Sequence, residues 1–313
     1  LLAAIENSGK QEDTKNADIE ISADAQKANG DEEETQDPIA AAGAENVAAT
    51  ATPVWTKQAE VNRDKLLDFD YLVKNFYRID RTTTIDSSEL NPGQLLAKDL
   101  TIDTNVGGPV ILIYHTHSQE GFVDSDGSEG MTVMGLGDRL TSLLQDTYGI
   151  PVLHHRGKYD VDGRDYAYSN AEPEIRQVLA DNPTIQVVID LHRDGVGDDV
   201  HLVTDIGGKQ TAKIMFFNGL SRTTSTGPID YLQNPNLQDN LATSLQMQIA
   251  AAELYPGFTR PVFLKGYRYN MHMCPKSMLI EVGAQTNTFE EVYNAMDPLA
   301  NILAYVLLGQ SHT

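Results

Sequence analysis

Three apolar segments, ILIYHTHSQE (residues 111–120), VVIDLHRDG (187–195) and MLIEVG (278–283), each end in or enclose residues that bind metals or move protons. Short continuous apolar runs are typical of strands buried in a parallel sheet. In open α/β sheets the ligand crevice lies at the carboxyl ends of the strands. The three segments therefore predict one site, at the rim of a sheet where their polar ends meet.

Strands and helices alternate around these segments, which predicts an α/β fold with a mostly parallel sheet flanked by helices. The expected strands cover residues 109–114, 152–154, 185–191 and 278–282, and the expected helices cover 131–147, 172–180, 237–249 and 288–308. A capping box, Thr288 to Glu291, opens the last helix. Residues 200–204 and 213–217 are expected to form a hairpin or adjacent strands, with Gly207-Gly208 as the turn.

The composition changes sharply along the chain and divides it into three parts. Residues 1–50 hold 12 acidic residues against 3 lysines and show no apolar periodicity. Such a segment buries too little apolar surface to offset its ordering entropy, so we predict a disordered acidic stalk over residues 1–60. Residues 61–107, with a short helical pattern, are interpreted as a small N-terminal subdomain or strap. Residues 108–313 are predicted to be the catalytic domain.

Net charge and cysteine content exclude several functional classes. The formal net charge is −22, which argues against a nucleic-acid partner and against electrostatic docking on anionic lipid. The single Cys274 permits no disulfide framework and no cysteine-based zinc site. No run of 18 apolar residues is present. Because the sequence begins at Leu1, we expect a mature or truncated form that has lost a signal or membrane anchor.

The polar ends of the three segments have the composition of a catalytic zinc site. His117, Glu120 and His192 supply two imidazoles and a carboxylate, the ligands that such sites use while keeping one position for water. Zinc lowers the pKa of bound water to about 7. Glu281, within an otherwise apolar strand, is the expected general base that takes the water's proton and returns it to the leaving nitrogen.

Two ligand positions have competitors. His115 would share the orientation of His117 if the strand continued, so it is a rival ligand, an outer partner of the site or a substrate contact. Glu129 competes with Glu120, because it lies just before a helix, where a carboxylate suits the dipole. His117 and Glu120 are the favoured ligands.

Two further segments carry polar groups of interest. Asp194 could orient an imidazole, and Arg193 could hold a substrate carboxylate or an oxyanion. The alternative is an Arg–Asp pair that only fixes the loop. Residues 267–270 (Tyr-Arg-Tyr-Asn) could line a groove for a sugar–peptide substrate, or form an ordinary turn.

At these motifs the sequence resembles the stage II sporulation protein P family over residues 66–308. The segments Tyr-His-Thr-His-x-x-Glu (114–120), Asp-x-His-Arg-Asp-Gly (190–195) and Leu-Ile-Glu-Val-Gly (279–283) stand in the expected order, followed by Asn287-Thr288. The resemblance implies a zinc-dependent N-acetylmuramoyl-L-alanine amidase, which cleaves peptidoglycan and possesses endopeptidase activity on peptide cross-links in some members.

The same resemblance implies a cellular setting. Family members act outside the cytoplasm during engulfment of the forespore, tethered by an N-terminal anchor, together with stage II sporulation proteins D and M. In this sequence a membrane contact is therefore expected only through a missing N-terminal anchor. Two other functions stay open: a carboxypeptidase-like zinc peptidase, for which no carboxylate-binding Arg–Asn pair can be assigned, and a non-catalytic module that binds the cell wall.

Overall fold

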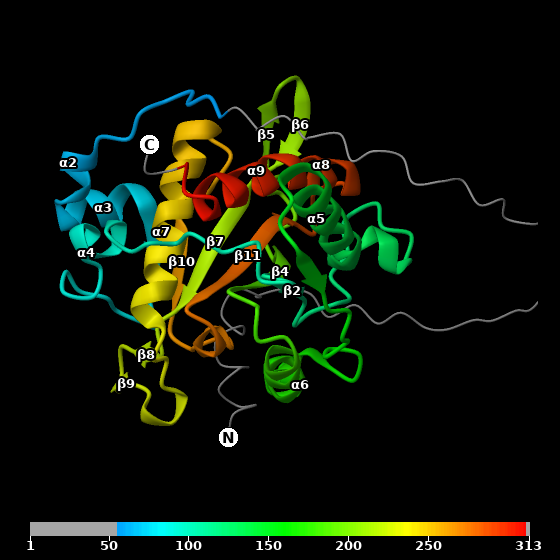
Figure 1. Ribbon diagram of the computed structural model, residues 1–313, viewed down its shortest axis with the longest axis horizontal. Coiled ribbons are helices and arrows are strands. Elements are labelled where there is room, and N and C mark those ends of the chain that lie inside the picture. The colour runs from blue at the N-terminus through cyan, green and yellow to red at the C-terminus, as the bar shows by residue number, and fades with distance from the viewer. Residues whose placement is uncertain (1–54, 311–313) are drawn as a thin grey trace, which may run out of the picture.

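The computed structural model describes residues 55–310, and the predicted stalk over residues 1–60 lies almost wholly outside them. A seven-stranded sheet forms the centre of the molecule, with the strand order β1-β10-β7-β11-β4-β2-β3 (Figure 1). Five of its six strand pairs are parallel, and only β7 and β11 run antiparallel. The predicted α/β fold with a mostly parallel sheet is therefore confirmed.

Helices flank the main sheet, and two short hairpins lie outside it. The strands of the main sheet are β1 (Tyr77–Ile79), β2 (Ile111–Tyr114), β3 (Val152–His154), β4 (Val187–Asp194), β7 (Ile214–Gly219), β10 (Val262–Lys265) and β11 (Lys276–Ala284). The hairpins pair β5 (Val203–Ile206) with β6 (Lys209–Ala212) and β8 (Arg222–Thr223) with β9 (Gly227–Pro228). The helices are α2 (Arg63–Leu66), α3 (Phe69–Phe76), α4 (Pro92–Leu96), α5 (Val133–Tyr148), α6 (Ala167–Asp181), α7 (Leu237–Leu254), α8 (Phe289–Asn294) and α9 (Met296–Leu307).

The two faces of the sheet bury different residues because side chains alternate along a strand. Ile111 and Ile113 belong to the larger hydrophobic cluster, which includes buried residues of α5, α7 and α9. Leu112 and Tyr114 belong to a smaller cluster with the apolar residues of α6. Helix α6 accordingly lies on the opposite face from the other long helices (Figure 1).

Three expectations about local structure were wrong or incomplete. The Gly207-Gly208 turn is present, with both glycines at positive φ, but it joins β5 to β6, whereas β7 enters the main sheet. The expected C-terminal helix is divided into α8 and α9. Pro298 has no N–H to donate to the carbonyl of Asn294, so one continuous helix would lose a hydrogen bond there. The edge strand β1 and its neighbour β10 were not predicted.

The predicted N-terminal subdomain or strap contributes directly to the central core. Strand β1 pairs with β10 at the edge of the sheet. Leu66, Leu72 and Leu95 are fully buried in the larger cluster. The boundary near residue 107 stays a prediction, although both sides of it share this core. No helix within residues 55–310 is long and apolar enough to cross a membrane.

Candidate metal and catalytic site

Strands β2, β4 and β11 run in the same direction, so their carboxyl ends reach the same edge of the sheet. In the register of these strands Tyr114 pairs with Asp190, and His192 pairs with Glu281. The loop after β2 carries His117 and Glu120 to the same place. This loop is attached to the start of α5, because the backbone N–H of Val133 donates a hydrogen bond to the carbonyl of Glu120 at 3.0 Å.

His192 and Glu120 form the centre of the site. Both side chains are buried, and Nδ1 of His192 lies 3.3 Å from Oε2 of Glu120. Ligand bonds of 2.0–2.2 Å in tetrahedral geometry place two zinc ligands about 3.3–3.6 Å apart. The two donor atoms thus have the separation that a shared zinc ion requires.

Asp190 fixes the orientation of this pair. Its Oδ1 lies 2.7 Å from Nε2 of His192, and it accepts hydrogen bonds from the backbone N–H and hydroxyl of Thr116 at 2.8 and 2.6 Å. A carboxylate on the outer nitrogen of a histidine is the usual support of a metal-binding imidazole, because it sets the ring's tautomer and direction. His192 is therefore held with Nδ1 toward Glu120.

His117 lies beside His192, with 5.4 Å between ring centroids. Its Nδ1 is 3.8 Å from Oδ2 of Asp160, which also accepts a hydrogen bond from Ser118 at 2.8 Å. The ring of Tyr168 packs against both imidazoles, at 5.8 Å from His117 and 6.5 Å from His192. Asp160 thus lies near Nδ1 of His117, at a longer distance than Asp190 keeps from Nε2 of His192.

The charges of the site favour a cation. Burial lowers the pKa of His192, but Asp190 and Glu120 outweigh this effect and raise it well above its usual value. Burial likewise raises the pKa of Glu120, but the hydrogen bond and charge of His192 hold it far below its usual range. The carboxylates thus favour a positive charge placed between them.

Within residues 55–310 no three His, Cys, Asp or Glu side chains are already arranged closely enough to hold an ion. The donor set nevertheless fits zinc, because Glu120 and His192 have the required separation and Asp190 lies 2.7 Å from the other ring nitrogen of His192. His117, Glu120 and His192 would hold the ion. Its binding would need a local shift of the His117 ring or the Glu120 carboxylate.

Glu120 has two other partners. Arg164 donates to Oε1 at 2.6 Å, and the backbone N–H of Arg193 donates to Oε2 at 3.0 Å. Glu129, its rival, lies elsewhere. Its carboxylate pairs with Arg156 and with Lys158, the latter at 2.7 Å, at the surface of the molecule. Of the two carboxylates, Glu120 alone lies against His192.

Glu281 is half-buried on β11, at the position that pairs with His192. Its negative charge helps to raise the pKa of Tyr168, after burial, Asp190 and Tyr269. The register of β11 against β4 shifts between Glu281 and Ala284. Such a bulge changes the direction of the side chains beside it. Gly283 lies within the bulge and has a positive φ of 58°.

His115 does not share the direction of His117, because β2 ends at Tyr114 and the alternation stops there. Its Nδ1 contacts the carbonyl of Leu191 at 2.7 Å, and its Nε2 contacts Nε2 of His154 at 2.9 Å. Both nitrogens are therefore occupied by protein groups. His115 supports the backbone of β4 and is not placed as a ligand.

Arg193 and Asp194 mainly fix the loop after β4. The Arg193 guanidinium donates to the carbonyls of Gly121 and Asp194 at 3.0 and 3.1 Å. The Asp194 carboxylate pairs with Arg260 at 2.5 Å and accepts from the N–H of Gly195 at 2.7 Å. The predicted pair between the Arg193 and Asp194 side chains is not present, because Asp194 pairs with Arg260 instead, and the contact of Arg193 with substrate stays a prediction.

Sequence reasoning missed four residues of the site: Asp160, Arg164, Tyr168 and Asp190. Asp190 had a usable signal, because it precedes His192 by two residues and so shares its face of the strand. Asp160 lies in a loop, Arg164 begins a short 3-10 helix (Arg164–Tyr166), and Tyr168 is in the first turn of α6. Nothing in the sequence indicates that the fold places these three residues near the carboxyl ends of β2 and β4.

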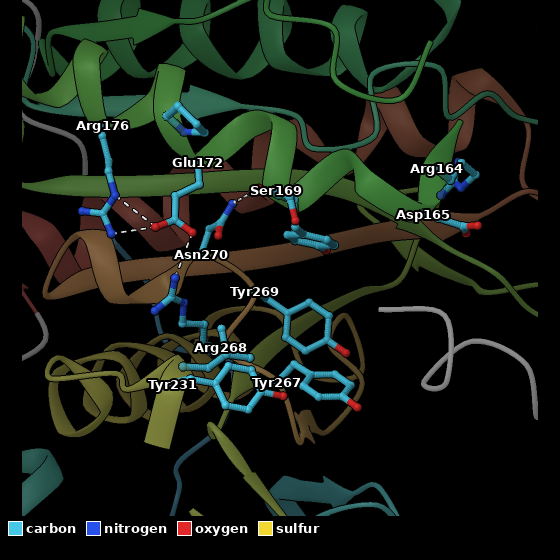
Figure 2. Close-up of a pocket in the computed structure, with 13 residues that line it drawn as sticks. Arg164, Asp165, Ser169, Glu172, Arg176, Tyr231, Tyr267, Arg268, Tyr269 and Asn270 are labelled. Carbon is cyan, nitrogen blue, oxygen red and sulfur yellow. Dashed lines mark hydrogen bonds and ion pairs between the residues drawn. The ribbon is translucent and has the colours of Figure 1, made fainter. Parts of the chain in front are cut away.

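A cavity of about 380 Å³ lies beside this site. It is lined on one side by α6 and the segment just before it, and on the other by Tyr231, Leu232 and residues 267–270 (Figure 2). Tyr168 belongs both to the lining and to the packing around His117 and His192. The segment 267–270 thus lines a groove, as one of its two interpretations predicted.

Comparison with known proteins identifies the family. The family model described as stage II sporulation protein P matches residues 3–304, nearly the whole chain. This chain belongs to the stage II sporulation protein P family. The family member of that name from Bacillus subtilis (strain 168) is 26% identical over 227 residues, which are 66% of this chain and 53% of the relative. The chain thus matches about half the length of this curated relative.

Among solved structures, the N-acetylmuramoyl-L-alanine amidase AmiC2 of Nostoc punctiforme is similar with a TM-score of 0.40 and 13% identity, covering 66% of this chain and 99% of that one. The catalytic domain of the CD27L endolysin targeting Clostridia difficile gives a TM-score of 0.41 and 12% identity, covering 64% and 97%.

Proposed function

We propose that this protein is a peptidoglycan hydrolase of sporulation that cleaves the amide between N-acetylmuramic acid and L-alanine with a zinc-activated water. One observation carries the proposal: His192, oriented by Asp190, presents Nδ1 to Glu120 at the spacing of two zinc ligands, and His117 lies alongside. Membership of the stage II sporulation protein P family supports a role in sporulation.

His117, Glu120 and His192 would hold the zinc, which when bound polarises the scissile carbonyl and lowers the pKa of water to about 7. Glu281 takes a proton from the attacking water and returns it to the leaving nitrogen. Asp190 and Asp160 keep the two imidazoles in their orientations. Tyr168, packed against both rings, excludes solvent from one side of them.

The cellular part of the proposal rests on the family. We place the enzyme outside the cytoplasm, tethered through an N-terminal segment, and acting in engulfment with stage II sporulation proteins D and M. Cleavage of stem-peptide cross-links would be a second activity of the same site, since that reaction also hydrolyses an amide.

The first test of this proposal separates the base from the ligands. Glu281→Gln should keep its zinc and lose about 10²–10⁴-fold in peptidoglycan hydrolysis, because it removes only general base catalysis. His192→Ala should lose the zinc itself. Glu290→Gln, on the exposed side of α8, is the matched control and should behave as the wild type.

Each variant has an outcome that contradicts its assignment. Hydrolysis at the wild-type rate by Glu281→Gln would remove Glu281 as the base. Unchanged zinc content in His192→Ala, measured by elemental analysis of the purified protein, would remove His192 from the metal site.

A further inference from the structure

The cavity beside the site carries a cluster of two arginines around one carboxylate. Glu172 accepts hydrogen bonds from Arg176 at 2.7 and 3.0 Å and from Arg268 at 2.9 Å. Figure 2 shows this cluster at one end of the cavity and Arg164 at the other. One carboxylate neutralises only one of the two guanidinium groups. The cluster therefore keeps a positive charge, in a protein whose net charge is −22.

The state of His272 adds no charge to this cluster. Its Nε2 lies 2.5 Å from the Arg176 guanidinium, which can only donate, and 3.2 Å from Glu172. Burial and the positive charge of Arg268 lower the pKa of His272 to about 4. The imidazole is neutral near pH 7, and the arginines carry the positive charge alone.

Tyrosines form the wall opposite α6. Tyr231, Tyr267 and Tyr269 face the helix across the cavity (Figure 2). Tyr269 and Asn270 both have positive φ, 48° and 54°, a conformation that costs non-glycine residues energy. The side chain of Asn270 donates to the carbonyl of Tyr168 at 2.8 Å, which ties this strained segment to α6. The wall is thus held in place without a ligand.

Gly219 at the end of β7 permits this arrangement. A Cβ atom there would lie 2.1 Å from the carbonyl oxygen of Tyr267, so a larger residue would displace the tyrosine wall. The cavity is therefore a built feature of the fold, with one wall fixed by a strained turn and the other by a helix.

Two residues of the cavity wall also contact the residues of the candidate catalytic centre. Arg164 lines the cavity and pairs with Glu120, and Tyr168 lines it and packs on His117 and His192. Tyr168 and Arg176 are eight residues apart on α6, a rise of about 12 Å. An extended peptide covers that distance in three to four residues.

We propose that this cavity binds the stem peptide of peptidoglycan through its free carboxylates, which the Arg176–Glu172–Arg268 cluster accepts while the tyrosines pack on the peptide backbone. The inference rests on the proposed hydrolase function, which places the scissile amide beside His192. Stem peptides carry free carboxylates on the residues that follow L-alanine. A neutral glycan would gain no ion pair from the excess positive charge of this cluster, whereas guanidinium groups pair well with carboxylates.

Binding can be tested without hydrolysis. The probe is a synthetic, uncross-linked stem peptide that begins at L-alanine, compared with the same peptide whose side carboxylates are amidated, by calorimetry on the full chain. We expect amidation to weaken binding to the wild type about tenfold. Arg268→Gln and Arg176→Gln should each weaken binding of the free-acid peptide by a similar factor and make binding insensitive to amidation. Arg139→Gln, which removes the ion pair with Asp297 on the other face of the sheet, is the control.

Arg268 is largely buried and Arg176 half-exposed, so Arg176→Gln is the variant to rely on if Arg268→Gln does not fold. Unchanged binding of the free-acid peptide by a folded Arg176→Gln protein, or equal binding of both peptides by the wild type, would overturn the inference. So would arginine-dependent binding of an uncharged chitin oligosaccharide, which has no carboxylate. Peptide binding that depends on the arginines, without cleavage of peptidoglycan, would sustain this inference and contradict only the hydrolase proposal.

Discussion

At the scale of single residues, the site depends on carboxylates that hold histidines. The sequence predicted the group of His117, Glu120, His192 and Glu281, because each follows or interrupts an apolar strand. It could not predict Asp160, which lies 43 positions after His117 in an irregular loop and meets it only in the folded chain. The expected shared direction of His115 and His117 was not realised, since β2 ends one residue before His115.

His272 should make the stability of the protein depend on pH. Its pKa is about 4 in the folded chain, below its ordinary value of 6.5, because of burial and Arg268. Between pH 6.5 and 4 the unfolded chain therefore binds the proton and the folded chain does not. The free energy of unfolding should fall as the pH is lowered through this window, by at most about 3 kcal/mol from this group.

The measurement is denaturant unfolding of the wild type and His272→Gln at several pH values from 7 to 4. The variant should lose less stability than the wild type over this range. Parallel curves for the two proteins would mean that His272 is protonated alike in both states.

At the scale of elements, apolar strands and periodic helices were predictable, whereas strands β1 and β10 were not. These two strands have three and four residues, and each includes a basic residue, so neither forms a continuous apolar run. Pro298 is a sequence signal for the break between α8 and α9. The prediction of one long helix relied instead on the capping box at Thr288, which marks only where a helix begins. The pairing of β7 with β11 follows from long-range contacts that a single sequence does not display.

Gly283 is the residue of β11 on which the bulge beside Glu281 depends. A Cβ atom there would lie 2.8 Å from Oδ1 of Asn287 and 2.9 Å from Cγ1 of Val292, at a φ of 58°. Gly283→Ala should therefore lower the free energy of unfolding by more than about 2 kcal/mol, from strain plus crowding, and reduce hydrolysis by displacing Glu281. The matched control is Gly207→Ala, with a φ of 61° but no atom within 4 Å, which should cost about 1 kcal/mol.

Denaturant unfolding of both alanine variants measures the difference between them. Equal losses of stability would show that the crowding around Gly283 relaxes at no cost and that the bulge is not tightly fixed.

At the scale of the whole molecule, the segment before residue 107 and the strands after it share one core. Glu253 at the end of α7 pairs with Arg63 at 2.9 Å and with Lys57 at 3.4 Å, which anchors the chain where it enters the domain. Leu72 on α3 is fully buried in the same cluster as the helices behind the sheet. These contacts predict one cooperative unit over the described residues.

Leu72→Ala should lower the free energy of unfolding of that whole unit by about 2–5 kcal/mol, in a single transition. Leu140→Ala, at an equally buried position of α5, should have an effect of the same order, and Leu67→Ala, 62% exposed, should change stability by less than about 0.5 kcal/mol. Fluorescence and circular dichroism should report the same midpoint for Leu72→Ala. A separate early transition in that variant would show that residues 61–107 fold as an independent subdomain.

The central claim is that His117, Glu120 and His192 hold a zinc ion that serves amide hydrolysis. The most direct test is to purify the full chain, quantify its zinc, and identify by mass the fragments it releases from purified peptidoglycan. We predict about one zinc per chain and free stem peptides that begin at L-alanine. Absence of zinc and of any product, even after zinc is added, would contradict the claim and favour a non-catalytic module that binds the cell wall.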